Sequence, residues 1–147
     1  MIPRYGDMPR PDQRFVHRPG AYAILPRGGQ ILLTFQETPE AEFQLPGGGI
    51  DAGESPLAAL HREVFEETGW AIATPRKLGT FRRFGYMPDY DIMAEKLCHI
   101  YIARPVLRHG PPLEEGHTAI WAAPETALGL LNGLGNADAL AAAMGIR

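Results

Sequence analysis

The chain has 147 residues, of which 45% are apolar and 21% are charged, and its formal net charge at pH 7 is −3. This length and composition are typical of one globular domain and unlike those of a disordered chain. The slight negative charge gives no electrostatic basis for binding along a nucleic acid, so we expect no nucleic-acid partner. A single cysteine, Cys98, excludes an internal disulfide and favours a reducing compartment.

Neither end of the chain has the pattern of a membrane or secretory segment. Residues 1–17 are broken by prolines and charges, which predicts an N-terminal arm rather than a signal peptide. The uncharged run 126–137 is too short and too rich in glycine to span a bilayer. We therefore expect a cytoplasmic protein without a membrane partner, with its folded domain over residues 18–147.

The first elements along the chain are short strands. Residues 21–26 and 30–36 are apolar and β-rich, and the residues 27–29 between them, Arg-Gly-Gly, indicate a hairpin. Residues 42–46 predict a third strand, which ends at the glycine turn 47–49. Residues 1–19 have no apolar periodicity and predict an irregular edge.

A helix follows the glycine turn. Ser55 is a suitable N-cap and Pro56 suits the first helical position. The helix is expected to run to about Thr68, because Gly69 supplies a C-terminal stop.

The second half of the chain continues with strands and ends in helices. Strands are predicted over residues 76–84, 95–107 and 117–123. Residues 85–94 are expected to form a loop between the first two of them. Residues 125–134 and 136–145 predict one helix or two short ones. This order of elements predicts an α/β (α+β) fold in which helices pack on a mixed sheet.

The predicted helix 56–68 concentrates its acids on one face. Because a helix turns about 100° per residue, Glu67 lies about 40° from Glu63 on one side, and Glu66 lies about 60° away on the other. Three carboxylates on one face repel one another, and Arg62 is the one cation placed to pair with them. The apolar arc of the helix begins beside Glu67, so the acids border the core instead of pointing away from it.

Such crowded carboxylates suit a hard divalent cation. Mg²⁺ takes oxygen ligands and usually keeps waters and substrate phosphates in its shell. The glycines 47–49 would let backbone come close to a ligand, and a carbonyl there could complete the metal shell. The alternative is a solvated surface helix with one salt bridge next to a glycine-rich hairpin.

The spacing of these residues resembles the signature of the Nudix hydrolase (MutT-like) family. From Gly48 onward, the chain matches every fixed position of G-x5-E-x7-R-E-U-x-E-E-x-G-U, where U is a bulky aliphatic residue. Val64 fills the first U, whereas Trp70 replaces the usual aliphatic residue at the last. The preceding segment FQLPGG also resembles the strand and turn that lead into this signature, which we call the box. The resemblance extends over about residues 18–145 and implies a Nudix-type α/β/α sandwich with a mixed β-sheet.

The resemblance also implies roles for the matching residues. Glu54 and Arg62 would form the ion pair that holds the loop against the helix. Glu63 or Glu67 would also orient or deprotonate water. The ligands of Mg²⁺ or Mn²⁺ would be the carbonyl of Gly47 and the carboxylates of Glu63, Glu66 and Glu67.

The reaction that the resemblance implies is attack of water on a diphosphate linkage in a nucleoside diphosphate joined to another group X. Some family members take a catalytic base from a late acidic loop, and here Glu114 and Glu115 are the candidates. We favour Glu115, with a solvated loop acid as the alternative. His117 lies close in sequence, but a lone loop histidine is more often structural or solvated.

Substrate contacts are expected from the segment 81–90. Arg83 can hold a phosphate, and Tyr86 and Tyr90 can stack on a base. Local packing of the same side chains is the alternative, because a strand alternates its residues between two faces.

The substrate stays open at this point. Tyr86 lies sixteen residues after Trp70, which resembles the dinucleoside polyphosphate hydrolases. Pro88 is a poorer match to the proline of the ADP-ribose pyrophosphatases, which would act on ADP-ribose or a nucleotide sugar. The coenzyme A signature is missing from residues 32–43. Nucleoside triphosphates, normal or oxidised, remain possible.

Three interpretations of function follow. The first is a pyrophosphatase that takes a small nucleotide-type substrate. The second is a non-catalytic Nudix-fold regulator that binds a nucleotide, which loss of a box acid would favour; none is lost. The third is a structural cation site on the acidic helix, which would leave the glycine turn, Glu54 and Arg62 as coincidences. The resemblance also makes a homodimer plausible.

Overall fold

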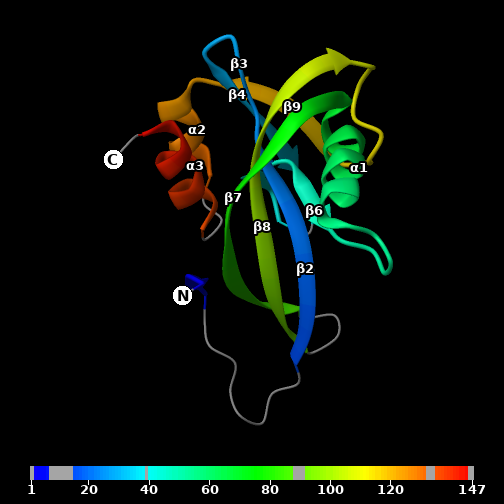
Figure 1. Ribbon diagram of the computed structural model, residues 1–147, viewed down its shortest axis with the longest axis vertical. Helices are drawn as coiled ribbons and strands as arrows, with labels where there is room; N and C mark the ends of the chain where they lie inside the picture. Colours follow the sequence, from blue (N-terminus) through cyan, green and yellow to red (C-terminus); the bar gives the residue numbers. More distant parts are fainter. Residues whose placement is uncertain (1, 7–14, 39, 88–91, 132–134, 146–147) are drawn as a thin grey trace.

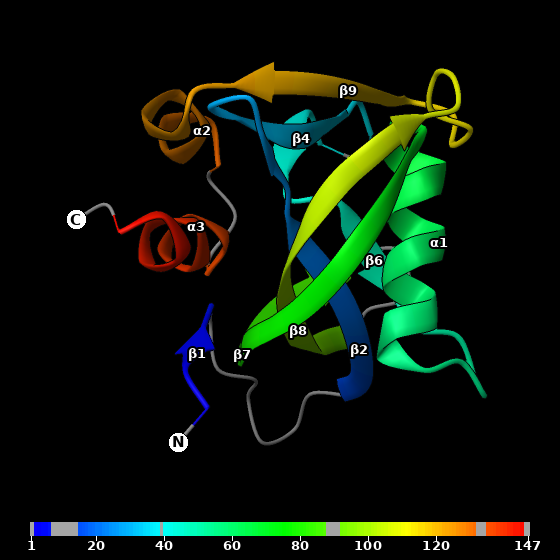
Figure 2. The ribbon, with the colours of Figure 1, turned by 45° about the horizontal axis from the view of Figure 1, so that its top comes forward.

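The computed structural model describes residues 2–6, 15–38, 40–87, 92–131 and 135–145. Two sheets lie between helices, with α1 on one side and α2 and α3 on the other (Figures 1 and 2). The expected α/β/α sandwich with a mixed sheet is therefore confirmed. No helix in these described ranges is long and apolar enough to cross a membrane.

The larger sheet has five strands in the order β1-β7-β8-β2-β6. The pairs β1–β7 and β2–β8 are parallel, whereas β7–β8 and β2–β6 are antiparallel. Its strands are β1 (Arg4–Tyr5), β2 (Phe15–Ile24), β6 (Gly47–Gly49), β7 (Trp70–Met87) and β8 (Ile92–Arg108).

The smaller sheet is antiparallel and is built around β4, which pairs with each of the other three strands. The expected hairpin around Gly28 and Gly29 is present as β3 and β4. The strands are β3 (Pro26–Arg27), β4 (Gln30–Gln36), β5 (Glu42–Gln44) and β9 (His117–Ala122).

Three helices cover the sheets: α1 (Pro56–Thr68), α2 (Pro124–Leu130) and α3 (Asn136–Met144). The C-terminal segment thus forms two short helices, one of the two alternatives that its glycines left open. Neighbouring residues of β2 supply both core layers, because a strand alternates its side chains. Ala23 packs in the cluster that holds Leu60 and Val64 of α1, whereas Ile24 packs in the cluster that holds Leu140 of α3.

The long strands differ from the expectation. β2 begins at Phe15, although residues up to 19 were expected to be irregular, and it pairs with β8 along its whole length. β7 continues to Met87 and β8 begins at Ile92, so most of the expected loop 85–94 is strand. Extended pairing between neighbouring strands overrides the weak local pattern. Pro19 is tolerated because β6 pairs only with Gly20, Ala21 and Tyr22.

Candidate active site

The helix that carries the acids is fixed at both ends as the sequence predicts. The Ser55 hydroxyl accepts a hydrogen bond from the backbone N–H of Ala58 at 3.1 Å. Gly69 ends the helix in the left-handed region, with φ of 77°, a conformation that glycine adopts without steric cost. Ser55 and Gly69 therefore fix where α1 begins and ends, and the helical periodicity then fixes the direction of each acidic side chain.

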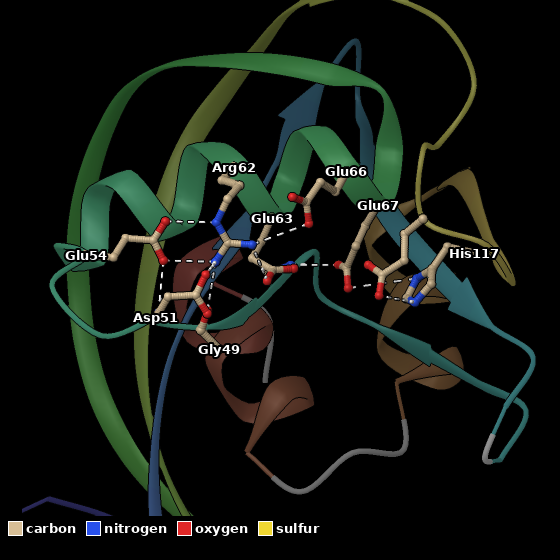
Figure 3. Close-up of polar contacts among 10 residues, drawn as sticks. Gly49, Asp51, Glu54, Arg62, Glu63, Glu66, Glu67 and His117 are labelled. Carbon is tan, nitrogen blue, oxygen red and sulfur yellow. Dashed lines mark hydrogen bonds and ion pairs between the residues drawn. The ribbon is translucent and has the colours of Figure 1, made fainter.

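Arg62 joins the acidic helix to the loop before it (Figure 3). Its Nε and Nη2 donate to the two oxygens of Glu54 at 2.8 and 2.9 Å, so the expected ion pair is present and bidentate. Nη1 donates to Glu63 at 2.9 Å and to Glu66 at 3.4 Å. Nη2 also donates to the carbonyl of Gly49 at 3.1 Å.

Asp51 is a further partner that sequence reasoning missed. Its carboxylate lies 3.4 Å from Nη2 of Arg62, and its backbone N–H donates to Glu54 at 3.0 Å. These hydrogen bonds from Arg62 first, and then from the Asp51 N–H, lower the pKa of Glu54 to about 2. The hydrogen bond to Glu54 first, and then that to Glu63, raises the pKa of Arg62 above its ordinary value, although burial opposes this rise. Both groups of the pair are therefore charged at neutral pH.

Glu67 is the most deeply placed acid of the helix, with a residue exposure of 5%. The backbone N–H of Gly47 donates to its Oε1 at 2.9 Å. Burial raises the pKa of Glu67 to about 9, and Glu63 adds to this rise, although the Gly47 N–H opposes it. Burial also raises the pKa of Glu63, against the pull of Arg62. Arg62 supplies a cation to Glu63 but not to Glu67, so a buried carboxyl group such as Glu67 would ionise more easily beside a bound metal ion.

The glycine strand β6 lies directly against these acids. A Cβ on Gly48 would collide with the carboxylate of Glu63, and one on Gly47 would collide with the backbone of Ala21 and Tyr22. Gly47 also has φ of 150°, which side chains rarely adopt. Gly47 and Gly48 are thus needed for the close packing of β6 against β2 and against Glu63, whereas the sequence suggested a close approach of this backbone to a ligand.

A late loop brings a fourth acid to the helix. The backbone N–H groups of Leu113 and Glu114 donate to the carbonyl of Glu66 at 2.8 and 2.9 Å, which fixes this loop on the end of α1. One ligand atom each of Glu63, Glu66 and Glu114 lie within 4.8 Å of one another. Glu115, the acid favoured from the sequence, is exposed and belongs to neither of the potential metal-binding groups found among the described residues.

His117 is a site residue that the sequence left as structural or solvated. Its Nδ1 lies 2.9 Å from the hydroxyl of Thr34 and 3.8 Å from Oε2 of Glu67, and its Nε2 lies 3.8 Å from Glu114. Glu67, Glu114 and His117 form the second group whose ligand atoms lie within 4.8 Å of one another. The sequence signal for a site role was its position at the start of a predicted strand, three residues after Glu114. The pairing of β9 with β4, which carries Thr34, appeared only in the structure.

A cavity of about 220 Å³ adjoins the acids on the α3 side of the sheet. Arg83, for which a substrate contact was predicted, is among the residues that line it. Polar side chains that sequence reasoning did not single out line it as well. They are Tyr22, Gln36, Gln44, Lys96 and Asn136.

The two tyrosines expected to contact substrate have different outcomes. Tyr86 lies three residues beyond Arg83 on β7, so strand alternation turns it to the opposite face of the sheet, and it is 49% exposed. It is not among the residues that line the cavity. Tyr90 lies outside the described residues.

The donor set fits a hard divalent cation. Four carboxylates, from Glu63, Glu66, Glu67 and Glu114, supply oxygen ligands, and backbone without side chains leaves space beside them. A structural ion site would be closed, whereas here a cavity lined by Glu67 opens beside the acids and leaves room for substrate oxygens next to an ion bound there.

The model of the NUDIX domain matches residues 16–142 of the chain. The chain belongs to the Nudix family. A provisionally named 8-oxo-dGTP diphosphatase of Bacillus subtilis (strain 168) is 38% identical over 64 residues, which cover 44% of this chain and 43% of that protein. An RNA pyrophosphohydrolase of Helicobacter pylori (strain ATCC 700392 / 26695) is 41% identical over 58 residues, which cover 36% of this chain and 37% of that protein. The chain therefore spans about two fifths of the length of these curated Nudix relatives.

A solved structure shows the same fold over most of the chain. A NUDIX hydrolase from Nitrosomonas europaea superposes with a TM-score of 0.69 at 19% identity, covering 88% of this chain and 90% of that one. The likeness to this Nudix structure concerns the fold alone.

Proposed function

We propose that the protein is a metal-dependent pyrophosphohydrolase that cleaves a diphosphate linkage in a nucleoside diphosphate joined to X. The observation that carries this proposal is that Glu63, Glu66, Glu67 and Glu114 belong to two adjoining groups of potential metal ligands, and that Glu67 also lines a cavity. Arg62 and Glu54 hold the helix and the preceding loop in place around these acids. Loss of a box acid would have favoured the regulator, and the box is complete.

The acids would hold Mg²⁺ (or Mn²⁺), with the carbonyl of Gly47 as a further ligand. The backbone of Gly47 already lies at Glu67, which supports that assignment. When bound, the ion neutralises charge on the phosphoryl oxygens and lowers the pKa of the attacking water.

The chain's own residues would then manage one proton. The water oxygen bonds to a phosphorus, and the bridging P–O bond breaks with its electron pair left on the departing phosphate. The water proton passes to a carboxylate, and we assign this role to Glu114. Its carboxylate joins both groups of potential metal ligands, and His117 lies 3.8 Å from it, whereas Glu115 is in neither group.

Two substrates come from the relatives' names, an oxidised nucleoside triphosphate and RNA. RNA would depart from the expectation that nucleic acid is no partner. A dinucleoside polyphosphate loses its support, because Tyr86 faces away from the cavity. We propose a nucleotide with a phosphate chain as the substrate class.

The test is phosphate-ester release with Mg²⁺ from a panel of ADP-ribose, dinucleoside polyphosphates, nucleotide sugars, coenzyme A, oxidised and normal nucleoside triphosphates, and 5′-triphosphorylated RNA. Glu67→Gln serves as the blank, since it keeps the shape and the Gly47 hydrogen bond but removes the charge. We expect turnover of at least one substrate and a loss of about a hundredfold or more in the variant. Equal activity in Glu67→Gln would overturn the metal assignment. Ligand binding without turnover on any substrate would favour the regulator.

A further inference from the structure

Arg83 and Lys96 place two positive charges side by side on the cavity wall. They are direct partners in the antiparallel pairing of β7 with β8, so their side chains leave the sheet on the same face. Like charges directly opposite each other in a sheet are destabilising. Lys96 is one of only two lysines in the chain, and nothing in the sequence singled it out.

No acid in the described ranges neutralises this pair. Neither side chain forms an ion pair or a side-chain hydrogen bond with a residue that the structure describes. Glu42, the carboxylate that acts on Lys96 from β5, already accepts hydrogen bonds from Gln36 at 3.1 Å and from Gln44 at 2.6 Å. The pKa of Lys96 is lowered, by burial first and by Arg83 second; Arg18 lowers it too, while Cys98 and Glu42 oppose the shift.

The pair and Glu67 line one cavity, together with Tyr22. Arg83, Lys96, Tyr22 and Glu67 all belong to its lining. Tyr22 pairs with Gly47, whose N–H donates to Glu67, so this tyrosine lies beside the acidic helix. A substrate in this cavity would therefore meet the carboxylate of Glu67, next to any ion that the acids hold, as well as the two cations.

An anion bound next to Arg83 and Lys96 would relieve the repulsion between their two positive charges. A neutral base would leave it in place, whereas a phosphate can accept a fork of hydrogen bonds from Arg83 and a further one from Lys96. We propose that Arg83 and Lys96 bind a further phosphate, next to the two phosphates of the diphosphate linkage that is cleaved. This proposal rests on the proposed function. The preferred substrate then carries at least three phosphates in a row, as in a triphosphate, rather than a diphosphate joined to an uncharged group.

Binding of inorganic tripolyphosphate, measured by calorimetry in metal-free buffer with EDTA, tests this without requiring hydrolysis. We expect Lys96→Met to weaken binding about tenfold or more, and Lys96→Arg to restore most of it. Lys77→Met is the matched control, because it removes the other lysine, which is exposed and bonded to His99 at 3.0 Å. Binding by Lys96→Met equal to that of the wild type, or an equal loss in Lys77→Met, would overturn the proposal.

A second readout does not depend on the folding of any variant. Reductive ¹³C-methylation labels the two lysines, and we expect tripolyphosphate to shift the Lys96 signal and to leave that of Lys77 in place. A Lys96 signal that does not move contradicts the assignment. Hydrolysis of the nucleotide panel, assayed beside these measurements, separates the two proposals. If nucleotides are hydrolysed but tripolyphosphate binds equally well without Lys96, only the proposed phosphate site is wrong. If binding depends on Lys96 but no nucleotide is hydrolysed, only the proposed hydrolase activity is wrong.

Discussion

Arg62 donates to both carboxylate oxygens of Glu54, at 2.8 Å from Nε and 2.9 Å from Nη2. The fork spans the boundary between the glycine loop and α1, so a single guanidinium sets where the loop lies relative to the acids. The same group reaches Glu63 and Glu66, which gives the cluster one positive charge among several negative ones. Geometry of this kind gives specificity as well as energy, because only a planar fork matches two oxygens at once.

Arg62→Ala should therefore cost both stability and activity. We expect the free energy of unfolding to fall on the order of 1 kcal/mol, with a lower melting temperature, because the charges are partly screened by solvent. We expect the hydrolysis rate to fall as well, since Glu63 and Glu66 lose the partner that orients them. Arg62→Lys is the control that retains the charge without the fork, and it should be intermediate. An unaltered melting temperature in Arg62→Ala would show that solvent screens the pair completely.

The same pair predicts a dependence of stability on pH. The pKa of Glu54 is about 2 in the folded chain, below the value of about 4.3 for a free glutamate. A depressed pKa means that the ionised form stabilises the fold above pH 4.3, and that this contribution is lost as the pH falls towards 2. Thermal melts of the wild type and Glu54→Gln between pH 6 and pH 2 measure it. We expect the advantage of the wild type over the variant to shrink across this range, and a constant difference would contradict the assignment.

The box residues could be placed from the sequence because a helix fixes their geometry locally. Glu63, Glu66 and Glu67 share a face at any position of α1 in the fold, and the cap at Ser55 sets where that helix starts. Asp51 lies in a loop, where spacing alone does not fix direction. Its contact with Arg62 therefore appeared only in the structure.

The cavity could not be read in the same way, because its residues come from distant strands and helices. Tyr22 is on β2, Gln44 on β5 and Asn136 at the start of α3, and only the pairing of the sheets brings them together. Tyr86 shows the same limit in reverse. Its place in an expected loop suggested a substrate contact, but the register of β7 against β8 decides the face to which a side chain points.

Glu114 and Glu115 offer a matched pair of variants for the base. Glu114→Gln should lower kcat by about a hundredfold or more, because its carboxylate lies among the potential metal ligands. Glu115→Gln, one residue away and in neither group of potential metal ligands, should leave kcat near that of the wild type. Steady-state kinetics on the substrate found in the panel, with melting temperatures alongside, checks both. The reverse pattern, with Glu115→Gln inactive, would restore the acid favoured from the sequence.

Gly48 and Gly49 allow a test of the close contact between β6 and α1. Neither glycine is among those with positive φ, so alanine is compatible with the backbone at both positions. A Cβ at Gly48 would collide with the carboxylate of Glu63, whereas one at Gly49 would meet no atom within 4 Å. The two substitutions add the same methyl group to neighbouring residues of one strand, so they differ only in what that methyl group meets.

Gly48→Ala should displace Glu63 and thereby weaken the binding of Mg²⁺ about tenfold or more, as expected when one carboxylate ligand of a small ion is moved. The increase in melting temperature with added Mg²⁺ measures this directly, since a ligand that binds only the folded state stabilises it according to its affinity. Gly49→Ala should show the same Mg²⁺ dependence as the wild type. If Gly48→Ala also keeps that dependence, then Glu63 moves aside without loss, and the ion must be held by Glu66, Glu67 and Glu114 without it.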